Sequence, residues 1–189
     1  MEKSSLPFSA IPQFSKRDKA YVSQDPVLRP FYLHTPDLAS FRKAIQHRDA
    51  YPTDRKLLSE VWKEQYDHRK PSDVILKHIE SIENPKTYTV TTAHQPSLFT
   101  GPLYYIYKAV STINLAERLR EEFPKAHFLP VFISGGEDHD FEEINHFHLF
   151  GNRIEWDSGE SGAVGQMSTD SLQEVLKQTR EVLGDAPNA

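Results

Sequence analysis

The sequence predicts an α/β fold with a parallel sheet that is incomplete within this chain. Residues 87–92 are rich in β-branched and aromatic side chains, and residues 128–133 form an apolar run, so both segments are predicted strands. A helix predicted over 103–122 separates them, which makes the two strands parallel neighbours. A doubly wound sheet normally has at least about four strands, so we expect a truncated fragment of a longer protein.

The region before the first strand is predicted to be an N-terminal domain of residues 1–85. Five prolines lie among scattered aromatic residues in the segment 1–36, which predicts an extended arm that packs over a neighbour. Three amphipathic helices are predicted to follow. The first covers residues 37–48, the second begins at a Thr53 cap and the third begins at a Ser72 cap.

The next predicted domain, residues 86–145, holds the strand–helix–strand unit. Its helix has a stripe of large apolar residues that we expect to face the sheet, namely Leu103, Ile106, Val110 and Ile113. The third domain, residues 146–189, is predicted to hold a β-hairpin and a helix. The hairpin pairs residues 147–150 with 153–156 across a Gly151-Asn152 turn, and the helix 170–183 starts with a capping box from Ser171 to Glu174.

Composition limits the function classes that this chain can serve. The 189 residues carry a net charge of −5 with no basic patch, which argues against a nucleic-acid partner. The absence of cysteine excludes disulfides, thiolate metal sites and a catalytic thiol. Neither a signal peptide nor a membrane-spanning apolar run is evident, so we expect a cytoplasmic protein without a membrane partner.

An acidic turn follows the second predicted strand directly and is the most informative stretch of the chain. Its residues are Gly135, Gly136, Glu137, Asp138, His139 and Asp140. Ligands of open α/β sheets bind at the carboxyl ends of strands, so these groups stand at a functional position. They are suited to bind Mg²⁺ or a substrate amine, with His139 as acid, base or phosphate donor; a His–carboxylate transition-metal site and a solvated helix start are the alternatives.

The segment from His94 to Gly101 occupies the equivalent place after the first strand. Thr100 and Gly101 precede Pro102 at the start of the long helix, where backbone N–H groups and the helix dipole favour a phosphate. His94 and Gln95 are candidate phosphate donors. The alternative, a turn whose polar residues only cap the helix, stays open, because the segment matches neither the P-loop nor the dinucleotide fingerprint.

Other polar and aromatic residues have simpler interpretations. His146 and His148 share one face of the predicted hairpin, where unliganded histidines are commoner than a metal pair. Tyr104, Tyr105 and Tyr107 are expected to pack rather than to stack on a ligand. Lys108 is expected to be a surface lysine.

Two motifs give the chain a family resemblance. They run from Thr92 to Tyr104 and from Pro130 to Asn145, and Ala163 to Gly165 adds a third match. With these motifs in this order the chain resembles the cysteine-adding enzymes of bacillithiol biosynthesis over residues 87–167. It departs from them where Ala93 and His94 stand in place of a Gly-Gln pair and where Ser97 stands in place of a glycine.

The resemblance implies a Rossmann-like core related to class I aminoacyl-tRNA synthetases and nucleotidyltransferases. It also implies an inserted connecting region, beginning within residues 146–189, and a coiled coil that makes the full-length protein a homo-oligomer. The implied activity is ATP-dependent addition of cysteine to glucosaminyl-malate through a cysteinyl-adenylate, with Mg²⁺ left open. Members of this family run well beyond the length of this chain.

These observations give each candidate residue a role. The predicted catalytic residues are His94, Asp138 and His139. The predicted ATP-binding residues are His94, Gln95, Thr100, Gly101, Gly135 and Gly136, and the predicted substrate-binding residues are Glu137, Asp138 and Asp140. No metal ligand is assigned. Two alternatives remain, a metal-dependent hydrolase that uses His94, Asp138, His139 and His146, and a non-catalytic module that self-associates through an exposed sheet edge.

Overall fold

The computed structural model describes residues 4–184 and divides into two compact units, of which the first ends at Asp54 and the second begins at Arg55. The helices α3 and α4 therefore belong to the same unit as the strands. The domain boundaries predicted after residues 85 and 145 stay predictions.

The first unit consists of short helices: η1 (Phe8–Ala10), α1 (Lys16–Val22), η2 (Pro26–Phe31), η3 (Leu38–Ser40) and α2 (Phe41–Asp49). The extended arm predicted over 1–36 is wrong for its described part, because Ser15 and Asp18 form a capping box that starts α1. Pro26 is compatible with η2, since it lies in the first turn, where no N–H is needed. None of the described residues of this unit is buried.

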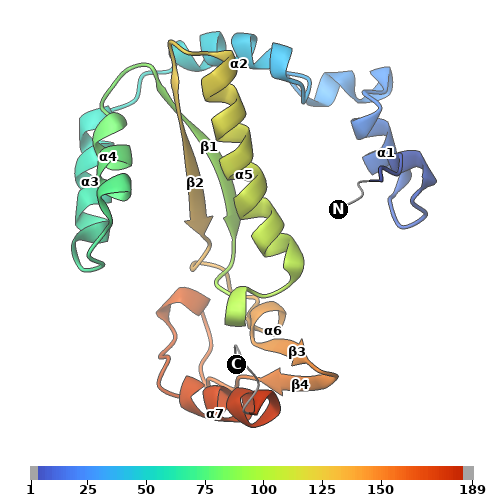
Figure 1. Ribbon diagram of the computed structural model, residues 1–189, viewed down its shortest axis with the longest axis vertical. Helices are drawn as coiled ribbons and strands as arrows, with labels where there is room; N and C mark the ends of the chain where they lie inside the picture. The colour runs from blue at the N-terminus through green and yellow to red at the C-terminus, as the bar shows by residue number, and fades with distance from the viewer. Residues whose placement is uncertain (1–3, 185–189) are drawn as a thin grey trace. The chain divides into compact units, whose positions relative to one another are not determined.

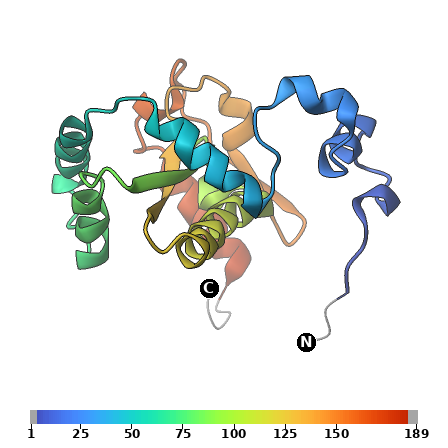
Figure 2. The same ribbon diagram turned by 90° about the horizontal axis from the view of Figure 1, so that it is seen from above.

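The second unit contains the predicted strand–helix–strand arrangement. Strand β1 (Thr87–His94) pairs in parallel with β2 (His127–Ser134), in a register that runs from Thr87 opposite His127 to His94 opposite Ser134. The connecting helix α5 (Leu103–Glu122) lies along the two strands (Figure 1), and Figure 2 shows it nearly end-on beside them. The predicted strands, their parallel pairing and the crossover helix are confirmed.

Strand β2 contains a proline that its position explains. The amides of His127 and Gly135 donate at 2.9 Å each to the carbonyls of Lys86, directly before β1, and His94, at the end of β1, so alternate residues from 127 to 135 face β1. Pro130 belongs to the other set of alternate residues, whose backbone groups face the free edge of the sheet. Its missing N–H therefore costs no hydrogen bond between the two strands.

The face of α5 that packs on the strands differs from the predicted one. The buried residues of α5 are Thr112, Ala116 and Leu119. The predicted inner stripe of Leu103, Ile106, Val110 and Ile113 is exposed instead, by 44–65%. Small side chains at 112 and 116 let the helix approach the sheet closely, whereas the stripe with the largest apolar side chains turns away from it.

Two antiparallel helices, α3 (Arg55–Asp67) and α4 (Asp73–Ser81), lie beside β2 (Figure 1). The guanidinium of Arg55 donates to the carbonyls of Ile82 and Thr87 at 3.0 and 2.9 Å, which ties the start of α3 to the start of β1. Ile79 and Ile82 are buried. Ser72 holds the predicted N-cap position of α4, although its side chain makes no capping hydrogen bond.

The chain after β2 forms a second cluster of elements. These are α6 (Phe141–Ile144), β3 (His146–Leu149), β4 (Asn152–Glu155), η5 (Val164–Gln166) and α7 (Leu172–Leu183), which enclose a core centred on Ile154, Trp156 and Val175. The hairpin turn lies one residue earlier than predicted. Phe150 and Gly151 have the positive φ angles of the turn, and Asn152 is the first residue of β4.

The predicted capping box at the start of α7 is absent. Ser171 makes no capping hydrogen bond, because its Oγ accepts the indole N–H of Trp156 at 2.7 Å. This bond satisfies the polar group of a tryptophan that is 5% exposed. Among residues 4–184, no helix has the length and apolar character required to cross a bilayer.

Candidate functional site

The two polar turns meet at one end of the β1–β2 sheet. His94 and Ser134 are register partners at the ends of the two strands, and the amide of Gly135 donates to the carbonyl of His94 at 2.9 Å. The loop after β1 and the acidic turn after β2 therefore start from hydrogen-bonded neighbours. The predicted juxtaposition of the two turns is confirmed.

His94 is held by hydrogen bonds at both ring nitrogens. Its Nδ1 lies 3.0 Å from the carbonyl oxygen of Gln95, and its Nε2 lies 2.9 Å from the hydroxyl of Tyr104. A carbonyl oxygen can only accept, so Nδ1 carries the proton, and in the neutral ring Nε2 accepts from Tyr104. The ring of Tyr105 packs against the same imidazole. In this arrangement His94 has no free N–H for a phosphate, because its one N–H donates to Gln95.

Tyr104 and Lys108 also lie beside the end of β1, and Lys108 is exposed, as predicted. The Lys108 ammonium donates to the carbonyl of Ala93 at 3.2 Å and lies 5.4 Å from the centre of the Tyr104 ring. Both residues are in the first two turns of α5. The helix starts near the end of β1 and runs back along it, so its first turns lie beside His94.

Gln95 joins the loop to the acidic turn. Its side-chain amide donates to Asp138 Oδ2 at 3.2 Å and to Glu143 Oε2 at 3.0 Å. The other oxygen of Asp138 accepts the amide of Asp140 at 2.8 Å. One neutral donor thus holds two carboxylates from different parts of the acidic segment. Glu143 is not among the predicted site residues, although the motif from Pro130 to Asn145 includes it.

The loop between His94 and α5 has an unusual backbone. Phe99, Thr100 and Gly101 have consecutive positive φ values of 48°, 70° and 59°. Thr100 is β-branched and rarely adopts this conformation, so the loop is strained. A Cβ on Gly101 would lie 2.8 Å from the Cβ of Ser97, so glycine is required there for space as well.

Packing against the C-terminal cluster holds this strained loop in place. Leu98 packs on the core around Ile154, and the Phe99 ring lies 4.9 Å from that of Phe147. The loop leads into Pro102, the N-cap residue of α5, where no side chain caps the helix. The first N–H groups of a 20-residue helix are thus left without a side-chain acceptor, next to Thr100 and Gly101.

The acidic turn is held on its other side by residues 163–165. The Val164 amide donates to the carbonyl of Asp138 at 2.8 Å, and the Gly165 amide donates to that of Gly136 at 2.7 Å. The sequence indicated this segment only through the family resemblance. The third matching motif, residues 163–165, therefore has a structural role, because its amides hold the acidic turn.

Some predicted site residues are not drawn into this network. The side chains of Glu137 and His139 are exposed and make no hydrogen bond or ion pair with any residue between 4 and 184. Asp140 caps α6 by accepting the amide of Glu143. His146 bonds Asn145 and lies 5.8 Å from His148 between ring centres. Over the described range, no three His, Asp or Glu side chains gather as metal ligands, so the set proposed for a hydrolase is not assembled.

Comparison with known proteins gives a consistent result. The family model for the N-terminal Rossmann-like domain of the bacillithiol biosynthesis protein BshC matches residues 1–189. A protein of Flavobacterium psychrophilum named "Putative cysteine ligase BshC" is 41% identical over 179 residues, covering 93% of this chain and 34% of that protein. A protein of the same name from Cytophaga hutchinsonii is 39% identical, covering 90% of this chain and 33% of its own length. The chain thus spans about a third of the length of these relatives.

Proposed function

Because this chain belongs to the BshC family of bacillithiol biosynthesis, we propose that it supplies the ATP-binding half-site of a ligase that joins cysteine to glucosaminyl-malate. The observation that carries the proposal is the hydrogen bond between Gly135 and His94. It fixes the loop that precedes α5 and the acidic turn at one rim of the sheet. A nucleotide and a cationic amine can therefore be bound side by side.

The loop is suited to the phosphates. The uncapped N–H groups at the start of α5 present donors beside Thr100 and Gly101, and the helix dipole favours an anion there. Lys108, one turn further on, adds a positive charge beside Ala93. ATP supplies the energy of ligation by activating the cysteine carboxylate.

The acidic turn is suited to the amino group of cysteine. Asp138 already lies at the rim, where Gln95 orients its carboxylate, and Glu137 and Asp140 are the further substrate-binding candidates. His94 and Asp138 are the catalytic candidates of this proposal. His139, which is exposed on the same turn, is assigned to the site by this proposal alone.

Positioning and charge stabilisation account for the chemistry in this proposal. One oxygen of the cysteine carboxylate attacks the α-phosphorus of ATP, the bond to the bridging oxygen breaks, and pyrophosphate leaves. The amine of the acceptor then attacks the activated carbonyl carbon and loses a proton, and AMP leaves. The full reaction, the coiled coil, the homo-oligomer and the cytoplasmic location are proposals for the longer protein.

Isothermal titration with ATP and cysteine-dependent exchange of pyrophosphate into ATP test the half-site in this chain. We expect His94→Ala to weaken ATP binding about tenfold or more, because the loop loses the hydrogen bonds that the imidazole makes with Gln95 and Tyr104. His148→Ala, an exposed histidine on β3, is the matched control. Unchanged affinity and exchange in both His94→Ala and His139→Ala would remove these residues from the site.

A further inference from the structure

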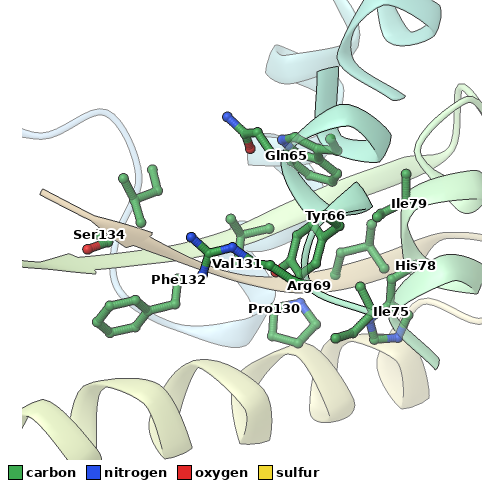
Figure 3. Close-up of a pocket in the computed structure, with 13 residues that line it drawn as sticks. Gln65, Tyr66, Arg69, Ile75, His78, Ile79, Pro130, Val131, Phe132 and Ser134 are labelled. Carbon is green, nitrogen blue, oxygen red and sulfur yellow. The ribbon is translucent and has the colours of Figure 1, made fainter. Parts of the chain in front are cut away.

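A cavity lies along β2, and its lining extends to Ser134, the last residue before the acidic turn. It has a volume of about 670 Å³, is open to solvent, and lies between α3, α4 and the length of β2 from Leu129 to Ser134 (Figure 3). Its helical wall carries Trp62, Gln65 and Tyr66 from α3, Arg69 from the turn that follows α3, and His78 from α4. This volume is within the range of small-molecule sites.

The charge of the lining is unlike that of the chain as a whole. The protein has 27 acidic residues and a net charge of −5, yet no acidic side chain lines this cavity. The formal charge of the lining comes from Arg69. A cavity with a cation and without carboxylates favours an anion over a cation or a metal ion.

The polar groups of the helical wall are not used within the protein. Among residues 4–184, neither the Arg69 guanidinium nor the Gln65 side-chain amide has a hydrogen-bond or ion-pair partner. The same holds for the Tyr66 hydroxyl and the Trp62 indole N–H. Donors that face a cavity without internal partners are free to bind a ligand.

The opposite wall does not favour an added β-strand as the occupant. Pro130 faces the free edge of β2 and has no N–H, which removes a donor from the middle of the edge. In Figure 3 the Pro130 ring and the side chains of Val131 and Phe132 lie along this wall. They give it an apolar surface on which a flat ring can pack.

We propose that this cavity binds a small organic anion with a flat aromatic ring, which would lie between the aromatic side chains of α3 and the side chains of β2 and pair with Arg69. The guanidinium matches a carboxylate or phosphate in geometry and charge. Trp62 and Tyr66 supply aromatic faces for the ring. The inference is independent of the ligase half-site, because it uses none of the groups of the two turns.

The chain contains its own reporter for this site. It has two tryptophans, of which Trp62 lines the cavity and Trp156 is buried elsewhere in the core. Labelling with 5-fluorotryptophan therefore gives one ¹⁹F signal for the site and one internal reference. The probe is 2-naphthoate, with neutral 2-naphthamide and ring-free acetate as comparison ligands.

We expect 2-naphthoate to shift the Trp62 signal in a saturable way and to leave the Trp156 signal in place. Arg69→Gln should weaken this binding about tenfold or more, whereas Arg118→Gln on α5, outside the cavity, should not. Equal affinity for 2-naphthoate and 2-naphthamide in the unchanged protein would overturn the proposal. So would binding by acetate alone as tight as that of 2-naphthoate, or no shift at Trp62. ATP binding by titration tests the ligase half-site, and the Trp62 signal tests the cavity, so failure of one proposal leaves the other unaffected.

Discussion

Gly165 and Gly136 are in backbone contact that leaves no room for a side chain. The Gly165 amide donates to the Gly136 carbonyl at 2.7 Å, and a Cβ on Gly165 would lie 2.8 Å from the Cα of Gly136. The Cα and the carbonyl oxygen of Gly136 are backbone atoms, so neither can rotate away from an added methyl group. The acidic turn keeps its position only if residue 165 is glycine.

Gly165→Ala is expected to destabilise the protein through this contact. Forcing a methyl group into packed backbone costs about 1–3 kcal/mol, which a urea unfolding curve would show as a lower midpoint. Gly135→Ala is the matched control, because a Cβ there would meet its nearest atom at an ordinary 3.7 Å. Equal midpoints for the two variants would show that the contact is not rigid.

Gln95→Met tests the bridge between the two turns. The substitution keeps the length of the side chain but removes the amide that donates to Asp138 and Glu143. We expect a loss of about 1–3 kcal/mol in the free energy of unfolding, because two carboxylates lose a shared donor. Gln178→Met removes an exposed bond to Glu174 of 3.4 Å and should change stability by less than about 0.5 kcal/mol. An equal loss in the free energy of unfolding for Gln95→Met and Gln178→Met would show that the bonds from Gln95 to the two carboxylates have no special role.

Tyr104→Phe tests the hydroxyl that binds His94. The ring stays, but Nε2 of His94 loses its donor, so the imidazole is less firmly oriented. The loss of one hydrogen bond can lower a rate by as much as about tenfold, and we expect a decrease of this size in the rate of cysteine-dependent pyrophosphate exchange. Tyr107→Phe removes a hydroxyl from an exposed residue of the same helix and should have no effect. A fully active Tyr104→Phe would show that His94 is oriented by Gln95 alone.

The elements of the βαβ unit could be predicted because each has a strong local signal. The β-branched run at 87–92, the apolar run at 128–133 and the prolines that flank α5 determine its strands and helix. The orientation of α5 could not be predicted in the same way. Hydrophobicity selects the most apolar stripe, whereas the sheet selects the stripe with small residues that allows close approach.

The meeting of the two turns could be predicted for a related reason. The ends of parallel strands meet wherever the strands pair, so His94 and Gly135 had to be neighbours. The partners of those residues depend on tertiary contacts that have no local signal. Tyr104, Glu143 and Gly165 reach the site from a helix start, a short helix and a distant loop.

The orientation of α5 predicts a sharp contrast between two of its residues. Leu119 is fully buried, so Leu119→Ala should lower the free energy of unfolding by about 2–5 kcal/mol. Ile106 is 46% exposed, and Ile106→Ala should cost less than about 1 kcal/mol. Urea unfolding of the two variants measures both values. The reverse order of costs would favour the stripe first expected from the sequence.

A histidine pair at the other end of the strands predicts how stability depends on pH. His78 on α4 and His127 at the start of β2 lie 6.4 Å apart between ring centres. Burial lowers the pKa of each below the usual 6.5, and the nearby Arg120 of α5 lowers both pKa values further. The folded state therefore favours the uncharged rings.

The sign of the effect follows from linkage. In the unfolded chain both pKa values return toward 6.5, so the unfolded state takes up protons first as the pH falls. The stability that the pair contributes is complete above about pH 6.5 and is lost as the pH falls from there to the lowered folded-state values. Unfolding midpoints measured from pH 7.5 to 5 should decrease less steeply in His78→Asn/His127→Asn than in the unchanged protein. His68→Asn, an exposed histidine between α3 and α4, controls for loss of a histidine alone, and a slope unaltered by the double substitution would mean that these rings do not control acid stability.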